Sequence, residues 1–264
     1  MISLISLAVL LLLVLLAYGY TPRPARAASG GSISVPSQWH AGHIGRIRIG
    51  TYNIHRCRGA DGQYDISRVA EVMRGADIVG LQEVGMAGWG EPQVAMLGRF
   101  LDLGWLYLPT RQRWFHNDRG NGLLSVFPAN HWHSERLPYS ARRTPRTLAS
   151  TRLLVGDKEL WVLITHLNTR EGRAEQLKLV LDRFSHYNPA ILLADLNTTP
   201  DDPIMLEYLQ HEEVVDALAI TLGETHATQR VDWILTRGLE IRSGQINENI
   251  ASDHPYYSVE VELT

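Results

Sequence analysis

Eight short apolar runs constrain the fold of this chain more than any other feature of its sequence. Each run is five to eight residues long and rich in Val, Ile, Leu or Trp, which is typical of buried β-strands. Amphipathic helical patterns lie between some of the runs, one behind Asp65 as an N-cap and one over residues 174–184. Strands interleaved with fewer helices predict an α/β or α+β layered fold with a mixed sheet. The predicted strands are Ile47–Ile54, Ile78–Glu83, Leu123–Phe127, Leu148–Val155, Leu160–His166, Ala190–Asp195, Val231–Thr236 and Tyr256–Leu263.

The N-terminal segment from Ile2 to Tyr20 carries no charge. Nineteen residues in a helix would span ~28 Å, close to the hydrocarbon thickness of a bilayer. We therefore expect residues 1–22 to form a single-pass anchor in the cell membrane. The alternative is a cleaved signal peptide, because Ala25-Arg26-Ala27 offers a small-x-small cleavage site, and cleavage would leave a secreted or periplasmic protein. The arginines after the segment favour a cytoplasmic domain, whereas extracytoplasmic hydrolases with weakly charged N-termini favour the opposite side.

The rest of the chain divides into a linker and one domain. Residues 23–45 are small, polar and rich in Gly and Pro, so they are predicted to be a flexible linker without a fold of its own. No second linker or repeat follows, and residues 46–264 are predicted to be one catalytic domain, which we expect to be monomeric. Without residues 1–27 the chain holds 23 basic and 28 acidic side chains, a charge that disfavours non-specific nucleic acid binding. The single Cys57 excludes an intramolecular disulfide.

Several predicted strands end in an acid, an amide or an imidazole. Each such residue has an ordinary alternative, since strand-terminal Asp and Asn often form caps or turns and a histidine can be a hydrogen-bonded core residue. Strand ends converge at one edge of a sheet, however, and ligand sites of layered folds lie at such edges. A site with this many oxygen donors suits Mg²⁺ or Mn²⁺ better than zinc. The residues are Asn53, Glu83, His166, Asp195, Asn197, Asp232, Asp253 and His254.

Seven short motifs occur in an order that resembles the endonuclease/exonuclease/phosphatase family, which includes deoxyribonuclease I and the neutral sphingomyelinases. They cover almost the whole predicted domain, and one departs from the usual family form because Ala194 stands where glycine is common. The resemblance implies a four-layer sandwich, with two mixed β-sheets packed face to face and helices outside. The motifs are Thr51-Tyr52-Asn53-Ile54, Leu81-Gln82-Glu83, Gly120-Asn121-Gly122-Leu123-Leu124-Ser125, Thr165-His166-Leu167-Asn168, Ala194-Asp195-Leu196-Asn197, Arg230-Val231-Asp232-Trp233-Ile234 and Ser252-Asp253-His254.

The resemblance also implies roles for individual residues. Asp195 would orient or deprotonate the attacking water, and His254, oriented by Asp232, would transfer a proton or contact the phosphate; either one could be the general base. The implied catalytic residues are Asp195, His254, Asp232, His166 and Asn197; the implied metal ligands are Glu83, Asn53 and Asp253; and the implied substrate-binding residues are Arg146, Asn121 and Asn168.

Residues 111–146 carry seven arginines against two acidic residues, with several Trp, Phe and Tyr nearby. A solvated loop region would explain this composition, because isolated surface charges need no special cause. An anion-receiving rim is the functional interpretation, since arginine binds phosphate bidentately and Trp with Arg suits a bilayer interface. Arg146, in Thr144-Pro145-Arg146, is the best single candidate for a substrate contact. His131-Trp132-His133 could be read as a metal pair, but nothing later in the chain completes it.

These expectations lead to a metal-dependent phosphoesterase in which an activated water attacks a phosphodiester or phosphomonoester in line. A membrane-tethered enzyme acting on a lipid headgroup or another small phosphoester is favoured. A nuclease is the main alternative, although its nucleic acid partner is not favoured because the sequence lacks a broadly basic composition. A non-catalytic binding scaffold is disfavoured, since every residue that the chemistry requires is present.

Overall fold

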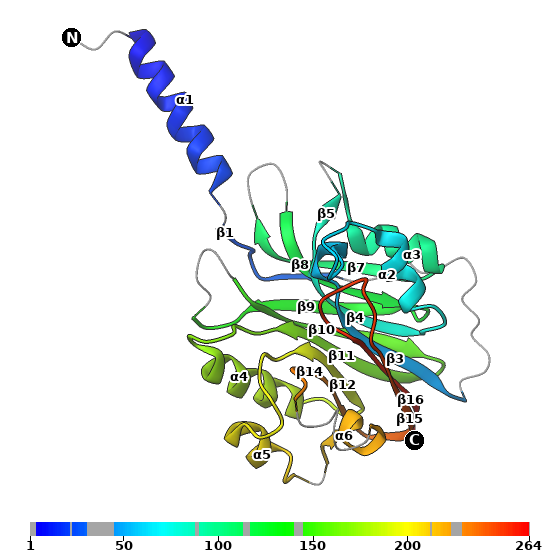
Figure 1. Ribbon diagram of the computed structural model, residues 1–264. Coiled ribbons are helices and arrows are strands. Elements are labelled where there is room, and N and C mark those ends of the chain that lie inside the picture. Colours follow the sequence, from blue (N-terminus) through cyan, green and yellow to red (C-terminus); the bar gives the residue numbers. More distant parts are fainter. Residues whose placement is uncertain are drawn as a thin grey trace.

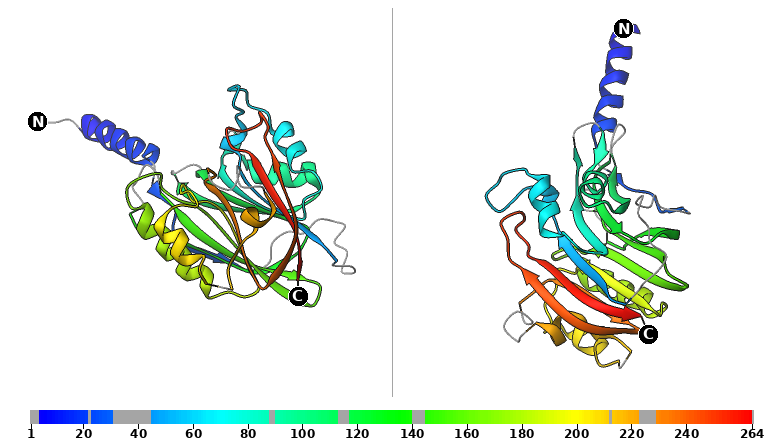
Figure 2. Two further views of the ribbon diagram at one scale, coloured as in Figure 1. Left: turned by 60° about the horizontal axis from the view of Figure 1, so that its bottom comes forward. Right: turned by 90° about the vertical axis from the view of Figure 1, so that its right-hand side faces the viewer.

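Two seven-stranded mixed sheets packed face to face form the centre of the protein (Figures 1 and 2). The computed structural model describes residues 4–21, 23–30, 45–87, 90–112, 117–139, 145–211, 213–222 and 229–263. The first sheet has the order β1 (Arg23–Pro24), β7 (Gly104–Gln112), β8 (Asn117–Ser125), β4 (Ile78–Val84), β3 (Ile47–Asn53), β16 (Tyr256–Leu263) and β15 (Leu239–Asn247). The second has the order β13 (Val215–Asp216), β14 (Asp232–Arg237), β12 (Ala190–Asp195), β11 (Lys158–His166), β10 (Thr147–Val155), β9 (Ala129–Arg136) and β2 (Ala28–Gly30).

Helices cover the outer faces of both sheets, which confirms the predicted four-layer sandwich. Apolar side chains of α2 (Ile66–Val72) and α3 (Gln93–Leu101) pack on the first sheet, and those of α4 (Arg173–Ser185) and α5 (Pro203–Tyr208) pack on the second. Asp65 caps α2 as predicted, because its carboxylate accepts hydrogen bonds from the amides of Ser67 and Arg68. The remaining elements are the short helices η1 (His55–Cys57) and α6 (Ala217–Thr221) and the strand pair β5 (Met86–Ala87) and β6 (Glu91–Pro92).

All eight predicted runs coincide with strands or, in the case of Leu123–Phe127, overlap the end of one. Three long strands, β7, β9 and β15, were not predicted. β7 contains Pro109 beside a bulge, and β9 is mostly polar. β15 lies at a sheet edge and alternates between exposed and half-buried positions, so its sequence lacks a continuous apolar run. β15 is an edge strand, and β7 and β9 are followed in their sheets only by the short strands β1 and β2, so none of the three needs a continuous apolar run.

The helix α1 (Leu4–Tyr20) projects away from this layered body in every view (Figures 1 and 2). Every residue of the helix except Gly19 is exposed. The exposed fraction reaches 88% at Leu4 and stays at 40% or more at the other leucines of the helix. Among the described residues, no helix meets the combined length and apolarity required to cross a membrane.

Part of the predicted flexible linker is folded. Residues 23–24 pair with β7 in the first sheet, and residues 28–30 pair with β9 in the second. The linker prediction was therefore wrong for residues 23–30, because small residues without periodicity can still pair as edge strands when two open sheet edges lie beside them. Residues 31–44, the rest of the predicted linker, lie outside the described part of the chain.

Candidate active site

The polar residues at the strand ends meet between the two sheets because strand side chains alternate with a period of two. Ile164 on β11, Leu193 on β12 and Ile234 on β14 all belong to the core between the sheets. On the same faces, His166 and Asp195 lie two residues after Ile164 and Leu193, and Asp232 lies two residues before Ile234, because β14 runs antiparallel to β12. Asn53 follows Ile49 in the same way on β3, at a spacing of four. The site is therefore the polar end of the core between the sheets, and strand alternation places its residues there.

Asp195 is the centre of this group and is 1% exposed. Its Oδ2 accepts a hydrogen bond from Asn53 Nδ2 at 2.9 Å and lies 3.3 Å from His166 Nε2. Its Oδ1 accepts the backbone amide of Asn197 at 3.1 Å. Burial and the nearby charge of Asp232 raise the pKa of Asp195, although its hydrogen bonds oppose this shift. Burial, together with the charges of nearby cationic groups, holds the pKa of His166 well below its usual range, so this imidazole is neutral at pH 7.

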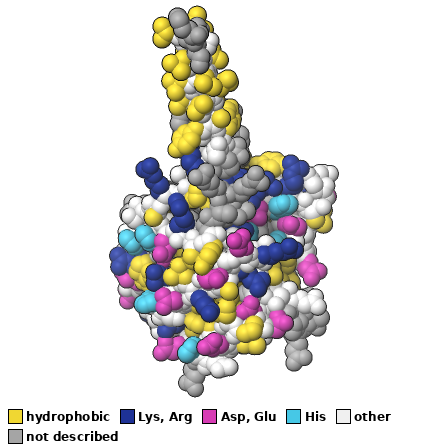
Figure 3. Space-filling view, turned by 90° about the vertical axis from the view of Figure 1, so that its left-hand side faces the viewer, with side chains coloured by type: hydrophobic (Ala, Val, Ile, Leu, Met, Phe, Trp, Pro, Cys, Tyr) yellow, Lys and Arg dark blue, Asp and Glu magenta, His cyan; other side chains and the backbone are white. Residues whose placement is uncertain are grey.

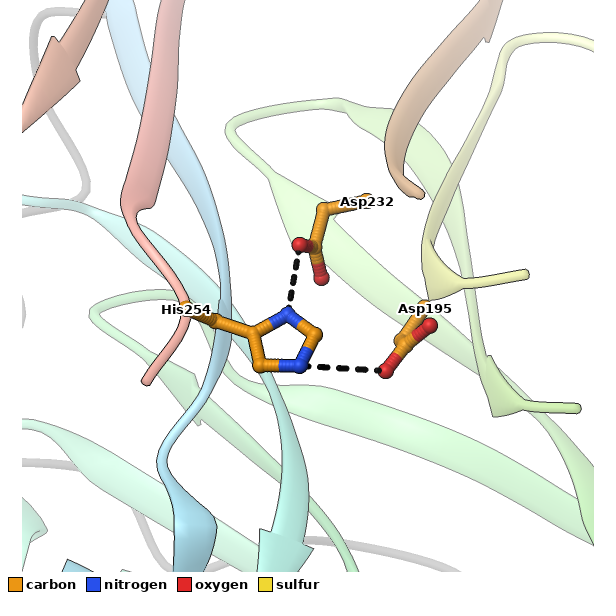
Figure 4. Close-up of side chains that lie close together, drawn as sticks. All are labelled: Asp195, Asp232 and His254. Carbon is orange, nitrogen blue, oxygen red and sulfur yellow. Dashed lines mark hydrogen bonds and ion pairs between the residues drawn. The ribbon is translucent and has the colours of Figure 1, made fainter. Parts of the chain in front are cut away.

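Asp232 and His254 form a hydrogen-bonded pair beside Asp195 (Figure 4). His254 Nδ1 lies 2.8 Å from Asp232 Oδ2, and its Nε2 lies 3.9 Å from Asp195 Oδ2. Burial lowers the pKa of His254, but the hydrogen bond and charge of Asp232, with the charge of Asp195, outweigh it and raise the pKa to about 9. His254 is therefore an imidazolium at neutral pH, with Nδ1–H donating to Asp232 and Nε2–H directed toward Asp195.

The loop that carries His254 is fixed to the end of β3. Ser252 Oγ donates to the backbone carbonyl of Asn53 at 2.6 Å and accepts the amide of His254 at 3.3 Å. Asp253, one of the predicted metal ligands, has a side chain that is 53% exposed and lies 3.4 Å from His55 Nδ1. Asp253 therefore lies at the solvent-facing rim, and Ser252, which had no predicted role, positions the histidine.

A β-bulge positions Glu83 at the end of β4. The pairing of β4 with β8 shifts between Leu81 and Val84, and Glu83 adopts a left-handed backbone conformation with φ of 54°. A bulge redirects a side chain relative to the regular alternation, and a non-glycine residue at positive φ is strained, so both features are typical of functional positions. The Glu83 carboxylate is 19% exposed and lies 3.9 Å from Arg119 Nη2. The sequence analysis gave Arg119 no role of its own.

The substrate-binding residues predicted on the second sheet form a connected group. Arg146 Nε donates to Asn168 Oδ1 at 3.2 Å, and Asn168 Nδ2 donates to the carbonyl of Glu171 at 2.9 Å. Burial lowers the pKa of Arg146 to about 10, while the charges of Asp195 and Glu83 act in the opposite direction, so the guanidinium stays protonated at neutral pH. Asn168 is therefore a positioning residue for Arg146.

The side-chain amides of Asn197 and Asn121 differ in their hydrogen bonding. Asn197, which also has a positive φ of 48°, donates its Nδ2 to the carbonyl of Leu167 at 3.0 Å and so joins the ends of β11 and β12. Asn121 on β8 is 2% exposed, and its Nδ2 has no hydrogen-bond partner among the described residues. Gln82, which was not predicted to have a role, links the sheets by donating to Thr51 Oγ1 at 3.2 Å and to the Leu193 carbonyl at 3.3 Å.

Of the arginine-rich segment, the structure brings Arg119 and Arg146 to the site. The remaining described arginines of the segment lie on strands: Arg111 on β7 and Arg136 on β9. Residues 113–116 and 140–144 lie outside the described part of the chain. His131 and His133 share one exposed side of β9, as two positions of a strand separated by one residue must.

The donor chemistry of the site fits a hard divalent cation. One ligand atom from each of Asp195, Asp232 and His254 lies within 4.8 Å of the others, and the buried Oδ1 of Asp232 accepts no hydrogen bond from any described residue. His254 Nδ1 is already engaged by Asp232, however, so this trio also suits proton transfer. Glu83 and Asn53 project from neighbouring parallel strands, because Asn53 pairs in register with Gln82. The carboxylates and amide oxygen of these residues are donors that Mg²⁺ and Mn²⁺ accept.

Comparison with known proteins found a matching protein-family model and solved structures with the same fold. A model of the endonuclease/exonuclease/phosphatase family matches residues 50–254. No curated protein sequence matches the chain significantly.

Solved structures share the fold at low sequence identity. An endonuclease/exonuclease/phosphatase from Beutenbergia cavernae is 23% identical with a TM-score of 0.67, over 83% of this chain and 72% of that one. A family protein from Bacteroides thetaiotaomicron is 15% identical with a TM-score of 0.66, over 82% and 97% of the two chains. TDP2 from Caenorhabditis elegans is 18% identical with a TM-score of 0.63, over 82% and 74%.

Proposed function

The chain belongs to the endonuclease/exonuclease/phosphatase family of metal-dependent phosphoester hydrolases, and we propose that it is a membrane-tethered member acting on a lipid headgroup or another small phosphoester. The observation that carries the proposal is α1, an exposed apolar helix joined directly to the catalytic domain. Leaving a leucine side chain in water costs about 1.5–3 kcal/mol relative to burial, so a helix with this surface favours an apolar surrounding such as the membrane.

The proposed reaction is attack of a water molecule on phosphorus, assisted by Asp195 and His254. The raised pKa of Asp195 makes this carboxylate a better proton acceptor than an exposed one, so Asp195 takes the proton of the water. His254 is charged at neutral pH and directs Nε2–H into the site, so it donates a hydrogen bond or a proton to a phosphoryl or leaving oxygen. Asp232 holds the imidazole in this orientation and stabilises its charge.

Hydrogen-bond donors of the chain would hold the phosphoryl oxygens. The charges of Asp195 and Glu83 act on Arg146, and Asn168 holds this side chain, so a guanidinium is available where negative charge develops. The neutral His166 contributes a ring N–H beside Asp195. The buried, unsatisfied Nδ2 of Asn121 is a further donor that an oxygen of the substrate could satisfy.

Glu83 and Asn53, supported by Asp253, would hold the metal, and Mg²⁺ is the expected ion, with Mn²⁺ as an alternative. When bound, a divalent ion neutralises phosphoryl charge and lowers the pKa of water. Glu83 forms an ion pair with Arg119 at 3.9 Å, which is longer than a hydrogen bond, so its carboxylate would still be able to coordinate such an ion.

Parallel assays of the full chain in Mg²⁺ test the proposal. One assay follows hydrolysis of phospholipids in mixed micelles, and the other follows cleavage of short single- and double-stranded DNA. We expect lipid turnover and little DNA cleavage. DNA cleavage at enzyme-like rates without lipid turnover would show that the chain is a nuclease instead.

A further inference from the structure

Residues 23–30, which we call the strap, follow α1 in the sequence and pair with the edges of both sheets. On the first sheet, Pro24 pairs with Arg111 and the Ala25 amide donates to the carbonyl of Thr110 at 2.8 Å. On the second sheet, Ala28 pairs with Ser134 and Gly30 pairs with Trp132. The two edges are thus closed on one side of the sandwich by a single continuous segment.

The strap is held by contacts at Ala25, at Gly30 and, toward α1, at Arg23, whereas residues 26–29 are exposed. Ala25 is 1% exposed, and its carbonyl accepts a hydrogen bond from Arg136 Nη2 at 3.4 Å. A Cβ on Gly30 would lie 2.4 Å from Trp132 Nε1, so a larger residue there would displace the Trp132 ring. At the helix end, Arg23 Nη2 donates to the Tyr18 carbonyl at 3.2 Å and its guanidinium lies 4.2 Å from the centre of the Tyr18 ring. These contacts hold the strap against both sheets and join Arg23 to Tyr18 of α1.

The strand register places the start of the strap at the active-site edge of the first sheet. Pro24 of β1 pairs with Arg111 of β7, which pairs with Arg119 of β8. The next residue of β8, Gly120, pairs with Val84 of β4, which is the neighbour of Glu83. Three strand spacings of ~4.8 Å separate β1 from β4, so the strap begins roughly 14 Å from the metal-binding candidate.

The second sheet gives the same placement. Arg136, which contacts the strap, pairs with Thr147, and its neighbour Leu148 pairs with Thr165, the residue before His166. The strand register of both sheets therefore places the exit of α1 at the edge of the domain that carries the site. Figure 1 shows the helix continuing outward from β1.

Arginines gather where the strap meets the sheets. We call this group the arginine collar: Arg23, Arg26, Arg111 and Arg136. Lys and Arg side chains lie close to the base of the apolar helix in Figure 3. No acidic residue precedes Asp61 in the sequence, so the strap itself adds only positive charge. A basic collar next to an apolar helix is complementary to an anionic bilayer surface.

We propose that the strap is a fixed connection that turns the active-site edge toward an anionic bilayer, so that the enzyme hydrolyses phosphoester headgroups of lipids in the membrane that holds α1. This inference rests on the proposed function for its substrate and on the strap geometry for its orientation. It also implies that the N-terminal segment is retained, because cleavage after Ala27 would remove β1 and the buried Ala25.

The first experiment measures orientation without any substrate. The full chain is placed in vesicles of mixed phosphatidylglycerol and phosphatidylcholine, and one dye is attached to Tyr139→Cys at the active-site edge or to Lys158→Cys at the opposite edge. Both positions are exposed, and the natural Cys57 is buried. Eight residues of β11 separate Lys158 from His166, which corresponds to ~26 Å at ~3.3 Å per residue. We expect energy transfer to labelled lipid headgroups to be strong from position 139 and weak from position 158.

The second experiment measures substrate turnover after a flexible insertion is placed between α1 and the strap. Ten Gly/Ser residues inserted between Thr21 and Pro22 add a flexible span of ~17 Å, and both strands of the strap keep their sequence. We expect hydrolysis of vesicle lipid to fall ~10-fold, while hydrolysis of soluble bis-p-nitrophenyl phosphate stays unchanged, because only the orientation toward the bilayer is lost. Arg26→Glu should lower turnover on anionic vesicles several-fold, whereas the matched Lys158→Glu should not.

The outcomes separate the two proposals. Equal energy transfer from the two labels, wild-type lipid turnover in the insertion variant, or a mature N-terminus at Ala28 would overturn the strap proposal. Strong orientation without lipid turnover would instead contradict the proposed substrate and leave the strap standing.

Discussion

The charge of His254 depends on Asp232, and replacing this one carboxylate tests that dependence. An imidazole in water has a pKa near 6.5, and a pKa of about 9 means that the folded site favours the imidazolium by ~3.4 kcal/mol. The hydrogen bond and charge of Asp232 are the largest contributions that raise this pKa, while burial opposes them. The isosteric Asp232→Asn removes the charge and keeps the burial, so we expect the pKa of His254 to fall to about 6.5 or below.

Nuclear magnetic resonance of the imidazole carbons measures this directly. Uniformly ¹³C-labelled protein in EDTA is titrated from pH 5 to 10, and the His254 signal is assigned from its absence in His254→Gln. Asp253→Asn is the matched control, because Asp253 is half-exposed and contributes least to the pKa of His254, so its loss should change that pKa little. A His254 pKa that stays near 9 in Asp232→Asn, or that is near 6.5 in the wild type, would refute the reasoning.

The Asp232–His254 pair also makes the stability of the fold depend on pH. Since the folded pKa of His254 is above its unfolded value, the stabilisation is fully present below pH 6.5 and is lost as the pH rises through about 9. The free energy of unfolding from urea titrations should therefore fall more steeply over this range in the wild type than in Asp232→Asn. Equal slopes would contradict the assigned pairing.

The remaining predictions concern the metal, the arginine and the contact between the sheets. EDTA should abolish hydrolysis of bis-p-nitrophenyl phosphate, and Glu83→Ala, Asp195→Ala and His254→Ala should each lose ~10²-fold or more in kcat/KM; undiminished activity in His254→Ala would disprove its role. Asn168→Ala should raise KM about tenfold by releasing Arg146. Asn130→Ala removes the matching amide contact to Arg152, which also pairs with Glu159, and should leave KM unchanged. Gly80→Ala should destabilise the fold by ~1–3 kcal/mol in urea unfolding, because its Cβ would lie 2.6 Å from Leu193 Cβ, and Gly45→Ala, with open space around it, should not.

Much of the site follows from patterns that a sequence displays. Buried strand runs that end in Asn53, His166 and Asp195 place these residues at one edge, because side chains two residues apart share a face. The structure brings them together within hydrogen-bonding distance or close to it. Asp232 and His254 are distant in the sequence from the other site residues, and the ordered motifs were needed to connect them.

Other features could not be predicted because they depend on pairing partners. The bulge at Glu83 exists only because β4 pairs with β8 out of regular register there. Arg119 faces Glu83 for the same reason, and Asn168 orients Arg146 across two loops that no local pattern links. Residues 23–30 read as a linker because their strand character comes from the edges of β7 and β9.

The sequence by itself determined the elements and the chemistry of this protein: eight buried strands, an apolar N-terminal helix, and acids, amides and imidazoles at the strand ends. Local periodicity and side-chain type are properties of neighbouring residues, so they can be read along the chain. Only the tertiary structure decided which strand edges meet, where the pairing register shifts, and at which edge α1 leaves the domain. Those features depend on register between segments far apart in sequence, and register is set by the packing of the whole sandwich.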